Sequence, residues 1–526
     1  MCPARLLILG IDAASPALLR RWMADGSLPH LASLAARGIR GPVRSVAGFH
    51  VGSTWPSFQT GLSPAGHGLH YLDQVRVGSY DYHQPFTAPG GVLGEPFWTV
   101  LSRAGQRLAV LDVPLSRLDP DLRGIQTVEW GGHDAIFGFQ AHPPELGGEI
   151  LSRFGPHPQG PVCDGRREDA SAWQAFTAGL VRGAGLKAQL TRACLGREDW
   201  DCLIQVFTEA HCAGHQAWHL HDPTHPAHDP ELTRLVGDPL HAVYRAVDAA
   251  VGQVLAEAGE ATVLVTSLHG MACFTGAPFL LPDLLNRLGV AAPAAVPQAP
   301  RTARTLAVDG LRAAWNRLPP RVRDRLRPLR QRWFPDPLPP PRSLGIDPAR
   351  SRCFAVGNGA PVGGIRLNLA GREPEGRLEP GPEADAFVAQ LRRDLLEIVD
   401  ERTGRPAIRA VHRTADLHQG PALDRLPDLL VEWSDERCTG SMALAGGREA
   451  TLRMTSPRIG TVEGRNWYGR SGDHRPGGLY LLAGPGIPAG GEAPAADVTA
   501  FAPAIIATLT RGASLPETLH HLSRPD

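Results

Sequence analysis

The stretch RLLILGIDAASP, residues 5–16, decides the fold class. Its apolar run shows no alternation with polar side chains, which is typical of a parallel strand covered on both faces. The run breaks at Gly10, Asp12 and Pro16, and a helical pattern follows. Similar apolar runs occupy 107–114, 201–211, 261–270, 427–433 and 477–486, and helical patterns occupy 172–196 and 239–259. The alternation predicts an α/β protein with a doubly wound, mostly parallel sheet flanked by helices.

Polar residues that follow the apolar runs are the first candidates for a functional site. Ligands of doubly wound sheets bind outside the carboxyl ends of the strands. Asp12, the segment 209–215, His269 and His474 all occupy such places in the sequence. We therefore expect these residues to lie close together at one edge of the sheet.

The composition excludes several classes of protein. Lys plus Arg equals Asp plus Glu, at 53 each in 526 residues, so no whole-molecule field favours nucleic acid. The eight cysteines are scattered without a C-x-x-C pair, which indicates a reducing compartment. The N-terminal apolar run has only about five residues, whereas a membrane span needs about 20. We expect a soluble, cytoplasmic protein with no nucleic-acid partner and no transmembrane segment.

The character of the sequence changes in its middle. Residues 301–332 contain ten Arg against two Asp and lead into the proline-rich FPDPLPPP. We expect a core built from residues 1–280 and 346–526, with an inserted helical, Pro- and Arg-rich cap at 281–345. The basic stretch is either a solvated face or a surface that binds an anionic partner, and the composition leaves both open.

Histidines are concentrated in HCAGHQAWHLHDPTHPAH, residues 211–228, which contains six of them. Two imidazoles four residues apart on a helix lie on one face, which is a spacing of metal ligands. His211 and His215 have this spacing, and so do His215 and His219. The segment starts where an apolar strand ends, so we expect at least one metal ligand in it.

Three further residues extend this prediction to other strand ends. His269 and His474 each stand beside glycines next to an apolar run, and Asp12 ends the first run. One cation could gather oxygen and imidazole ligands from these places. Mixed His and carboxylate ligands favour zinc.

Four segments of the sequence together resemble the alkaline phosphatase superfamily. They are LLILGIDAASPALLRRWMADGSLPHLASLAARGIRGPV at 6–43, TWPSFQTGLSPAGHG at 54–68, GGIRLNLAGREPEG at 363–376 and SGDHRPGGLYLLAGPGIP at 471–488. The branch that they resemble most is that of the type I phosphodiesterases and nucleotide pyrophosphatases. The resemblance implies two bound metal ions, usually zinc, and a Ser or Thr nucleophile at a helix N-terminus.

Carried over residue by residue, the resemblance assigns metal ligands to Asp12, His215, His269 and His474. The sequence also departs from the family pattern. His211 stands where the family has the aspartate of its D-x-x-x-H pair, Leu268 replaces the aspartate of D-H-G, and Val51 falls on the nucleophile. We therefore expect one main zinc site made of His211, His215 and His474, with Asp12 and His269 forming a weaker second site or a remnant of one.

The segment FHVGSTWPSFQTGLSPAGHG, residues 49–68, leaves the nucleophile open. If the register is shifted by two or three residues, Ser53 or Thr54 attacks, although both hydroxyls also suit simple N-capping. Otherwise a metal-activated water attacks, with Glu209 or a neighbouring histidine as general base. A third alternative is a catalytically silent protein that binds a ligand or partner on the same fold.

Substrate contacts are expected from residues beside these ligands. Arg470 and Arg475 flank His474 and have the geometry to hold an oxyanion, and His50 lies next to the nucleophile segment. His133 and Asp134 either line the pocket or form a polar turn. The sequence thus predicts a zinc-dependent hydrolase of a phosphoester, phosphodiester or related anionic ester, with one or two zinc ions and a small anionic substrate. A homodimer stays an open alternative.

Overall fold

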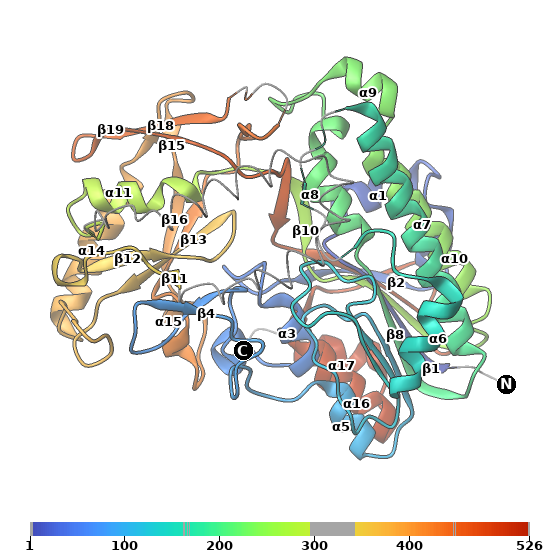
Figure 1. Cartoon of the computed structure of the whole chain (residues 1–526). Helices are drawn as coiled ribbons and strands as arrows, with labels where there is room; N and C mark the ends of the chain where they lie inside the picture. The colour runs from blue at the N-terminus through green and yellow to red at the C-terminus, as the bar shows by residue number, and fades with distance from the viewer. Residues whose placement is uncertain are drawn as a thin grey trace, which may run out of the picture.

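The architecture follows from a computed structural model that describes residues 4–160, 164, 165, 167, 169–294, 342–444, 447 and 449–523. Two lobes lie side by side (Figure 1). The larger lobe carries both described ends of the chain, and the smaller one is built mainly from residues after 340. Most of the predicted cap, residues 295–341, lies outside the described residues, and with it the Arg-rich stretch.

The larger lobe is organised around one mixed sheet. Its strands run in the order β22 (Gly491–Glu492), β2 (Ile39–Arg44), β21 (Gly478–Ala483), β9 (Thr262–Ser267), β1 (Ala4–Ile11), β8 (Trp200–Phe207), β5 (Leu108–Leu111), β6 (Gly124–Val128) and β7 (Gln140–His142), and β23 (Ala496–Asp497) pairs with β2. The five strands from β9 to β6 are parallel. The predicted doubly wound, largely parallel fold is confirmed.

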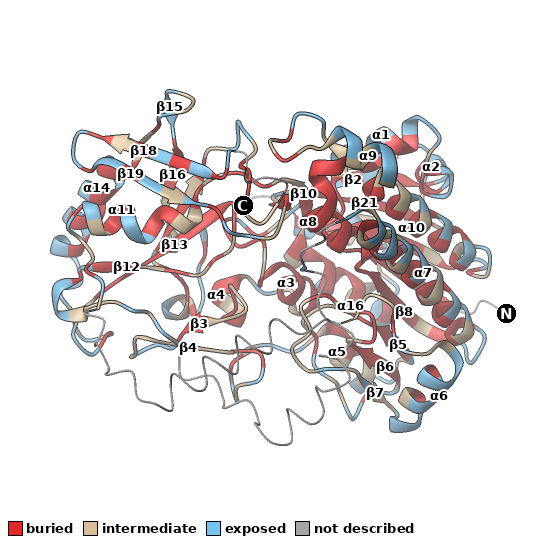
Figure 2. Cartoon of the chain, turned by 45° about the horizontal axis from the view of Figure 1, so that its top comes forward, coloured by how far each residue is buried: buried red, intermediate tan, exposed pale blue. Residues whose placement is uncertain are grey.

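Helices cover both faces of this sheet. One face packs against α1 (Pro16–Ala24), α2 (Pro29–Ala36), α6 (Pro144–Phe154), α7 (Ala170–Leu195), α8 (Glu209–His221), α9 (Pro230–Val236) and α10 (Pro239–Leu255). The other face packs against α3 (Thr54–Thr60), α4 (Pro64–His67), α5 (Phe97–Arg103), α16 (Phe501–Arg511) and α17 (Leu515–Leu522). The helices turn buried residues to the sheet and exposed ones to solvent (Figure 2). Burial on both faces explains why β1 is apolar from Leu6 to Ile11.

Two of the apolar runs are not parallel strands of this sheet. β21 belongs to it but runs antiparallel to both of its neighbours, β2 and β9. β17 (Leu429–Trp433) lies in the smaller lobe, between two antiparallel partners. An unbroken apolar run indicates that a strand is buried on both faces. It does not indicate the direction of the strand or the sheet to which the strand belongs.

The smaller lobe has its own sheets and its own apolar core. One sheet has the order β12 (Cys353–Val356), β13 (Val362–Leu367), β17 and β16 (Ile408–Arg413), and the other β15 (Arg405–Pro406), β14 (Val399–Asp400), β18 (Thr451–Ser456) and β19 (Gly460–Arg465). Helices α11 (Leu281–Arg287), α14 (Pro382–Leu396) and α15 (Thr414–Leu417) accompany them, and β11 (Arg342–Ser343) pairs with β4 (Asp81–His83), which pairs with β3 (Gln74–Val75). The described ends of the predicted cap thus belong to helix α11 and strand β11.

A short ribbon of two strands joins the lobes. In it β10 (Gly270–Cys273) pairs antiparallel with β20 (Gly472–Arg475), so Met271 faces His474 in register. A disulfide between Cys273 and Cys438, whose Cα atoms are 5.6 Å apart, ties the end of this ribbon to the smaller lobe. The two cysteines are separated by 165 residues, so spacing alone did not indicate the pair. A disulfide is typical of oxidising surroundings, and the prediction of a reducing compartment therefore gains no support from it.

Among the described residues, no helix is both long enough and apolar enough to cross a bilayer.

Candidate metal centre

Helix α8 begins two residues after β8 ends and carries the first two candidate ligands. His211 and His215 lie one turn apart on it, and both side chains are buried. The helix approaches the β10–β20 ribbon closely at two glycines. A Cβ on Gly214 would lie 2.6 Å from a side-chain atom of Met271, and a Cβ on Gly472 would lie 2.2 Å from the Gly214 carbonyl oxygen. This close approach brings the third ligand, His474 of β20, against the helix.

Three imidazole nitrogens converge at this contact. The Nε2 atom of His474 lies 3.0 Å from His215 Nε2 and 3.0 Å from His211 Nε2. Burial lowers the pKa of both His215 and His474 well below its ordinary value, so these rings are neutral. The structure thus brings together the three histidines that the sequence predicted as the main metal ligands.

The opposite nitrogen of each ring has its own acceptor. His211 Nδ1 lies 2.5 Å from Asp12 Oδ2, and His215 Nδ1 lies 2.9 Å from the Gly472 carbonyl oxygen. His474 Nδ1 lies 3.1 Å from the His50 carbonyl oxygen. A neutral imidazole carries one proton, and the acceptors assign it to Nδ1 in His215 and His474. In His211 the nitrogen that faces Asp12 is likewise Nδ1, so Nε2 of all three rings is turned to one point.

Such a cluster suits a cation. Lone pairs that meet without a proton repel one another, and a metal ion at their meeting point removes the repulsion. Tetrahedral zinc, with Zn–N bonds of about 2.0–2.1 Å, separates its ligand nitrogens by about 3.3 Å, close to the spacing found. Histidine ligands that donate their second nitrogen to a carboxylate or carbonyl are the usual arrangement in metal sites.

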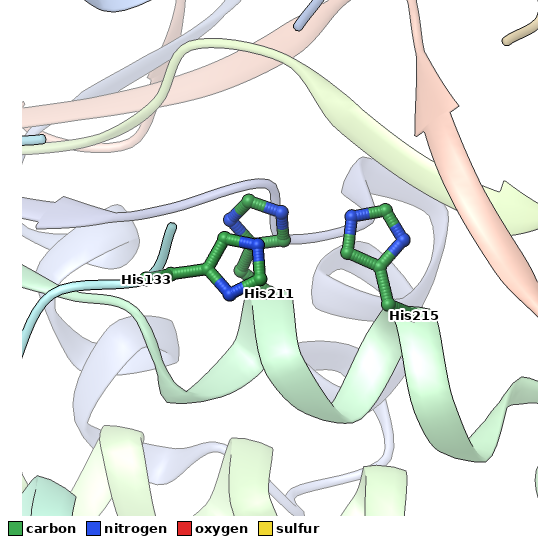
Figure 3. A group of neighbouring side chains, drawn as sticks. All are labelled: His133, His211 and His215. Carbon is green, nitrogen blue, oxygen red and sulfur yellow. The ribbon is translucent and has the colours of Figure 1, made fainter. Parts of the chain in front are cut away.

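A fourth histidine lies over the cluster. The ring of His133, from the loop after β6, is 3.9 Å from the ring of His211, and nitrogens of His133, His211 and His215 all lie within 4.8 Å of one another (Figure 3). His133 Nε2 is 3.1 Å from Asp134 Oδ2. Glu129 ties this loop together, since its carboxylate accepts backbone hydrogen bonds from three consecutive residues, 136–138.

Asp473 is a neighbour that the sequence reasoning missed. One of its carboxylate oxygens lies within 4.8 Å of ligand nitrogens of His215 and His474. Burial raises the pKa of this carboxyl. Its place beside His474 in GDHR was visible in the sequence, but successive side chains of a strand point to opposite faces, so being adjacent to His474 did not mark it as a neighbour of the cluster.

Both carboxylate oxygens of Asp12 accept a hydrogen bond in the arrangement described. Its Oδ1 accepts a hydrogen bond of 2.7 Å from Trp55 Nε1, and its Oδ2 accepts the one from His211. Burial by itself raises the pKa of this carboxyl, but His211 and the hydrogen bonds hold it below its ordinary value. The structure thus places Asp12 behind His211, as an acceptor that orients the ring.

The other predicted ligand, His269, is close to the cluster but makes no hydrogen bond. Its ring centre is 4.7 Å from that of His474. Neither ring nitrogen has a hydrogen-bond partner among the described residues, and burial lowers its pKa to about 4. Leu268, in place of the family's aspartate, is fully buried in the apolar core. The predicted weaker site therefore has the imidazole of His269, and its carboxylate is that of Asp12, whose oxygens each accept one hydrogen bond.

The candidate nucleophiles face other groups. Ser53 Oγ is 3.5 Å from His67 Nε2, and Thr54 Oγ1 donates to the His50 carbonyl oxygen at 3.4 Å. Ser53 occupies the N-cap of α3, but its side chain makes no capping bond. Val51 packs against Gly359, where its methyl carbon would lie 2.4 Å from an added Cβ. None of these contacts involves the three converging nitrogens.

Glu209, predicted as a general base, points away from the cluster. Its Oε1 lies 3.2 Å from His157 Nε2 and 3.6 Å from Lys187 Nζ, in a fully buried network beneath the start of α8. Lys187 is the only lysine of the chain, and its ammonium also donates to the carbonyl oxygens of Gly131 and Val206. Glu209 stands two residues before His211, so the helix turns it by about 200° from that histidine.

The predicted substrate-binding residues divide into two places. Arg470 donates to Asp164 at 2.8 Å beside the cluster. Burial by itself lowers the pKa of Arg470, but Asp164, Asp473 and Asp134 raise it. Arg475 and His50 instead line a cavity between the lobes.

Three of the four remaining histidines of 211–228 bond to other groups. His219 Nδ1 bonds Ser471 Oγ at 3.0 Å, His221 Nδ1 bonds Asp238 at 2.6 Å, and His228 Nδ1 bonds the His219 carbonyl oxygen at 2.7 Å. The Nδ1 atom of the fourth, His225, accepts a hydrogen bond from the Ala227 backbone N–H at 3.0 Å. Regular spacing pointed to this segment but did not select the two histidines that meet His474.

Known proteins share this architecture. The structure resembles crystal structures of phosphonoacetate hydrolase from Sinorhizobium meliloti 1021, at 14% sequence identity and with 96% of each chain covered. The TM-score is 0.50 for the complex with phosphonoacetate and 0.48 for the complex with phosphonoformate. The first of these likenesses shows the fold. No curated protein matches the chain in sequence. The profile described as type I phosphodiesterase / nucleotide pyrophosphatase matches residues 6–297, more than half of the chain, which therefore belongs to that family of the alkaline phosphatase superfamily.

Proposed function

We propose that the chain is a metal-dependent hydrolase of phosphoric esters that works with a single cation at His211, His215 and His474. The observation that carries this proposal is the convergence of three Nε2 lone pairs, each fixed by an acceptor at the opposite ring nitrogen. Membership of the phosphodiesterase family supports the hydrolytic chemistry.

Zinc suits the ligand set best. Three neutral imidazoles with a further position open are typical of catalytic zinc. When bound, zinc lowers the pKa of water towards neutrality and withdraws electrons from a phosphoryl oxygen. Nitrogen ligands of this kind also bind other divalent transition metals, so the metal itself is part of the proposal.

The residues around the cluster have distinct parts in this proposal. Asp12 keeps the His211 ring in the tautomer that offers Nε2. Arg470, oriented by Asp164, offers N–H groups to the non-bridging oxygens of an anionic substrate.

Proton transfer falls to His133, which Asp134 orients. With valine at residue 51, water itself forms the new P–O bond. His133 takes the proton that this water loses and returns it to the oxygen that leaves phosphorus. One water is consumed, and one phosphoric ester bond is broken.

The experiment combines metal analysis with turnover. Wild type, His215→Ala and His221→Ala are purified without added metal, and zinc per chain is measured by elemental mass spectrometry. Each is then assayed, before and after chelation and reloading, on an aryl phosphate, a bis-aryl phosphodiester, an aryl phosphonate ester and phosphonoacetate. His221 is the matched control because it lies on the same helix but pairs with Asp238.

We expect about one zinc per chain and zinc-dependent turnover in wild type and His221→Ala, and loss of both in His215→Ala. Turnover that survives in His215→Ala would contradict the metal assignment. Bound zinc without turnover of any ester would favour the catalytically silent alternative.

A further inference from the structure

The disulfide between Cys273 and Cys438 lies where the β10–β20 ribbon meets the smaller lobe. Cys273 is the last residue of β10 and faces Gly472 in register, two residues before the candidate metal ligand His474. Cys438 lies in the segment between β17 and β18 of the smaller lobe. The disulfide therefore joins the smaller lobe to the pair of strands that carries His474.

Backbone hydrogen bonds connect this disulfide to the histidine cluster. The Thr439 N–H, next to Cys438, donates to the Phe274 carbonyl oxygen at 2.8 Å, and the Phe274 N–H donates to the Ser471 carbonyl oxygen at 2.8 Å. The Ser471 N–H in turn donates to the His215 carbonyl oxygen at 2.7 Å. Three hydrogen bonds thus lead from the disulfide to the helix that carries His215.

The noncovalent pairing at this junction is short. Thr275 and Cys438 form an isolated bridge and not a strand pair, and Thr439 Oγ1 donates to the Gly276 carbonyl oxygen at 3.3 Å. A single hydrogen bond adds little net stability, because water competes for the same groups. We therefore expect the covalent bond to restrict the movement of the ribbon against the smaller lobe more than these contacts do.

The disulfide is more accessible than the free thiols. Cys273 and Cys438 are half-buried, and residues 435–437, directly before Cys438, are exposed. The free cysteines in the described part of the chain are all buried, and they are Cys194, Cys202, Cys212 and Cys353. Thiol–disulfide exchange requires that a thiolate reach one sulfur, and exposed disulfides are often the labile or regulatory ones. A soluble reductant thus reaches the disulfide before it reaches a buried cysteine.

We propose that the Cys273–Cys438 disulfide is a redox-sensitive tie. The intact bond holds the β10–β20 ribbon in place, and its reduction weakens metal binding at the histidine cluster. The effect on the metal rests on the proposed function, whereas the effect on the ribbon requires neither a metal ion nor turnover. Groups that orient metal ligands from outside commonly change affinity by about 10–100-fold, so we expect reduction to raise the zinc Kd about tenfold.

The reductant that this proposal requires is a dithiol. One of its thiolates attacks a sulfur of the disulfide, the bond between the two cysteine sulfurs breaks, and a mixed disulfide forms. The second thiolate of the reductant then displaces the attached cysteine. The dithiol loses two electrons and two protons and becomes a disulfide, and Cys273 and Cys438 gain them and become thiols.

The test compares oxidised and reduced full-length protein. A trialkyl phosphine is the reductant here, because dithiols themselves bind zinc. It takes oxygen from water to become its oxide, and it is removed under anaerobic conditions before each measurement. Alkylation and mass spectrometry establish that the two cysteines are bonded before reduction and free after it. Amide hydrogen exchange of chelator-treated protein is followed in 270–275 and 471–475, and competition with a chromophoric chelator gives the zinc Kd.

Two variants separate the disulfide from other effects of the reductant. Cys273→Ser/Cys438→Ser cannot form the bond, and Cys353→Ala removes a buried thiol from the core of the smaller lobe. In wild type we expect reduction to speed exchange in the ribbon about threefold or more, because a segment without its tie opens locally more often. The double variant should show the faster exchange and the higher zinc Kd without reductant. Cys353→Ala should behave as wild type does.

Three results would overturn the proposal. They are cysteines that are already free in protein purified in air, ribbon exchange that is unchanged after complete reduction, and a zinc Kd that is unchanged after complete reduction. If the double variant does not fold, the reduced wild type decides the question. A chain that binds no zinc in either redox state would contradict the proposed function instead, and hydrogen exchange would still decide whether the disulfide holds the ribbon.

Discussion

The two halves of the candidate metal centre differ in how their side chains are held. In one half, His211, His215 and His474 each have an acceptor for Nδ1 and present Nε2 to a common point. In the other half, His269 has no hydrogen-bond partner among the described residues. There the apolar side chain of Leu268 stands where the family has an aspartate. Under the proposed function, the difference between the halves lies in preorganisation as well as in ligand identity.

One substitution links the two halves. With an imidazole at residue 211, a proton faces Asp12, whereas an aspartate there would place two carboxylates together and require a cation between them. Asp12 then accepts one hydrogen bond from His211 and one from Trp55. We infer that the same carboxylate that serves the family as a ligand serves here to position one.

The largest change in zinc content is expected when one histidine is removed from each half in turn. His474→Ala should reduce bound zinc from about one per chain to less than about a tenth, because it removes the ligand that joins the other two. His269→Ala should leave the zinc content unchanged. Elemental mass spectrometry of the two purified variants measures the difference, and an equal loss in both would mean that the two halves form one site.

The sequence predicted the sheet and the strand ends that surround this site better than the side-chain contacts within it. Unbroken apolar runs and helical periodicity depend on burial, and they gave the sheet, its helices and the strand ends where His211, His269 and His474 gather. The pairing of Asp12 with His211 depends on side-chain contacts between residues 199 apart in sequence. No local pattern carries that information.

The two acid–histidine pairs beside α8 illustrate the same limit. Asp12 with His211 faces the cluster, whereas Glu209 with His157 faces Lys187 in the core. Their residue types are nearly equivalent, and only the direction of each side chain separates a positioning group from a buried structural network. Lys187 is the single lysine among 53 basic residues, and three acceptors surround its ammonium. Composition alone could therefore have marked Lys187 as a residue with a special environment.

An intermediate effect is expected from Asp12→Asn. The variant removes the charge behind His211 but keeps the shape of the side chain, so zinc should still bind at one per chain with a Kd raised about 10–100-fold. Competition with a chromophoric chelator measures that Kd. A fall in stoichiometry from two zinc ions to one would instead identify Asp12 as a ligand in the half that we regard as a remnant.

The smallest effect is expected at the hydroxyl groups of α3. Ser53→Ala and Thr54→Ala should each change kcat/KM for the best ester by less than about threefold, whereas loss of a true nucleophile costs on the order of 10⁴-fold or more. Ser57→Ala is the matched control, since its hydroxyl shares His67 with Ser53.

The reason lies in the protonation of His67. Its Nδ1 accepts a hydrogen bond of 3.1 Å from the Leu69 backbone N–H, so the ring proton is on Nε2, which donates to Ser57 Oγ at 2.9 Å. Burial lowers the pKa of His67 to about 3, so the ring stays neutral in this tautomer. A nitrogen that already carries its proton cannot remove one from Ser53. A large rate loss in Ser53→Ala but not in Ser57→Ala would therefore require α3 to turn the Ser53 hydroxyl toward the histidine cluster. Ser53 would then be the nucleophile, in the half of the site where Leu268 replaces the family's aspartate.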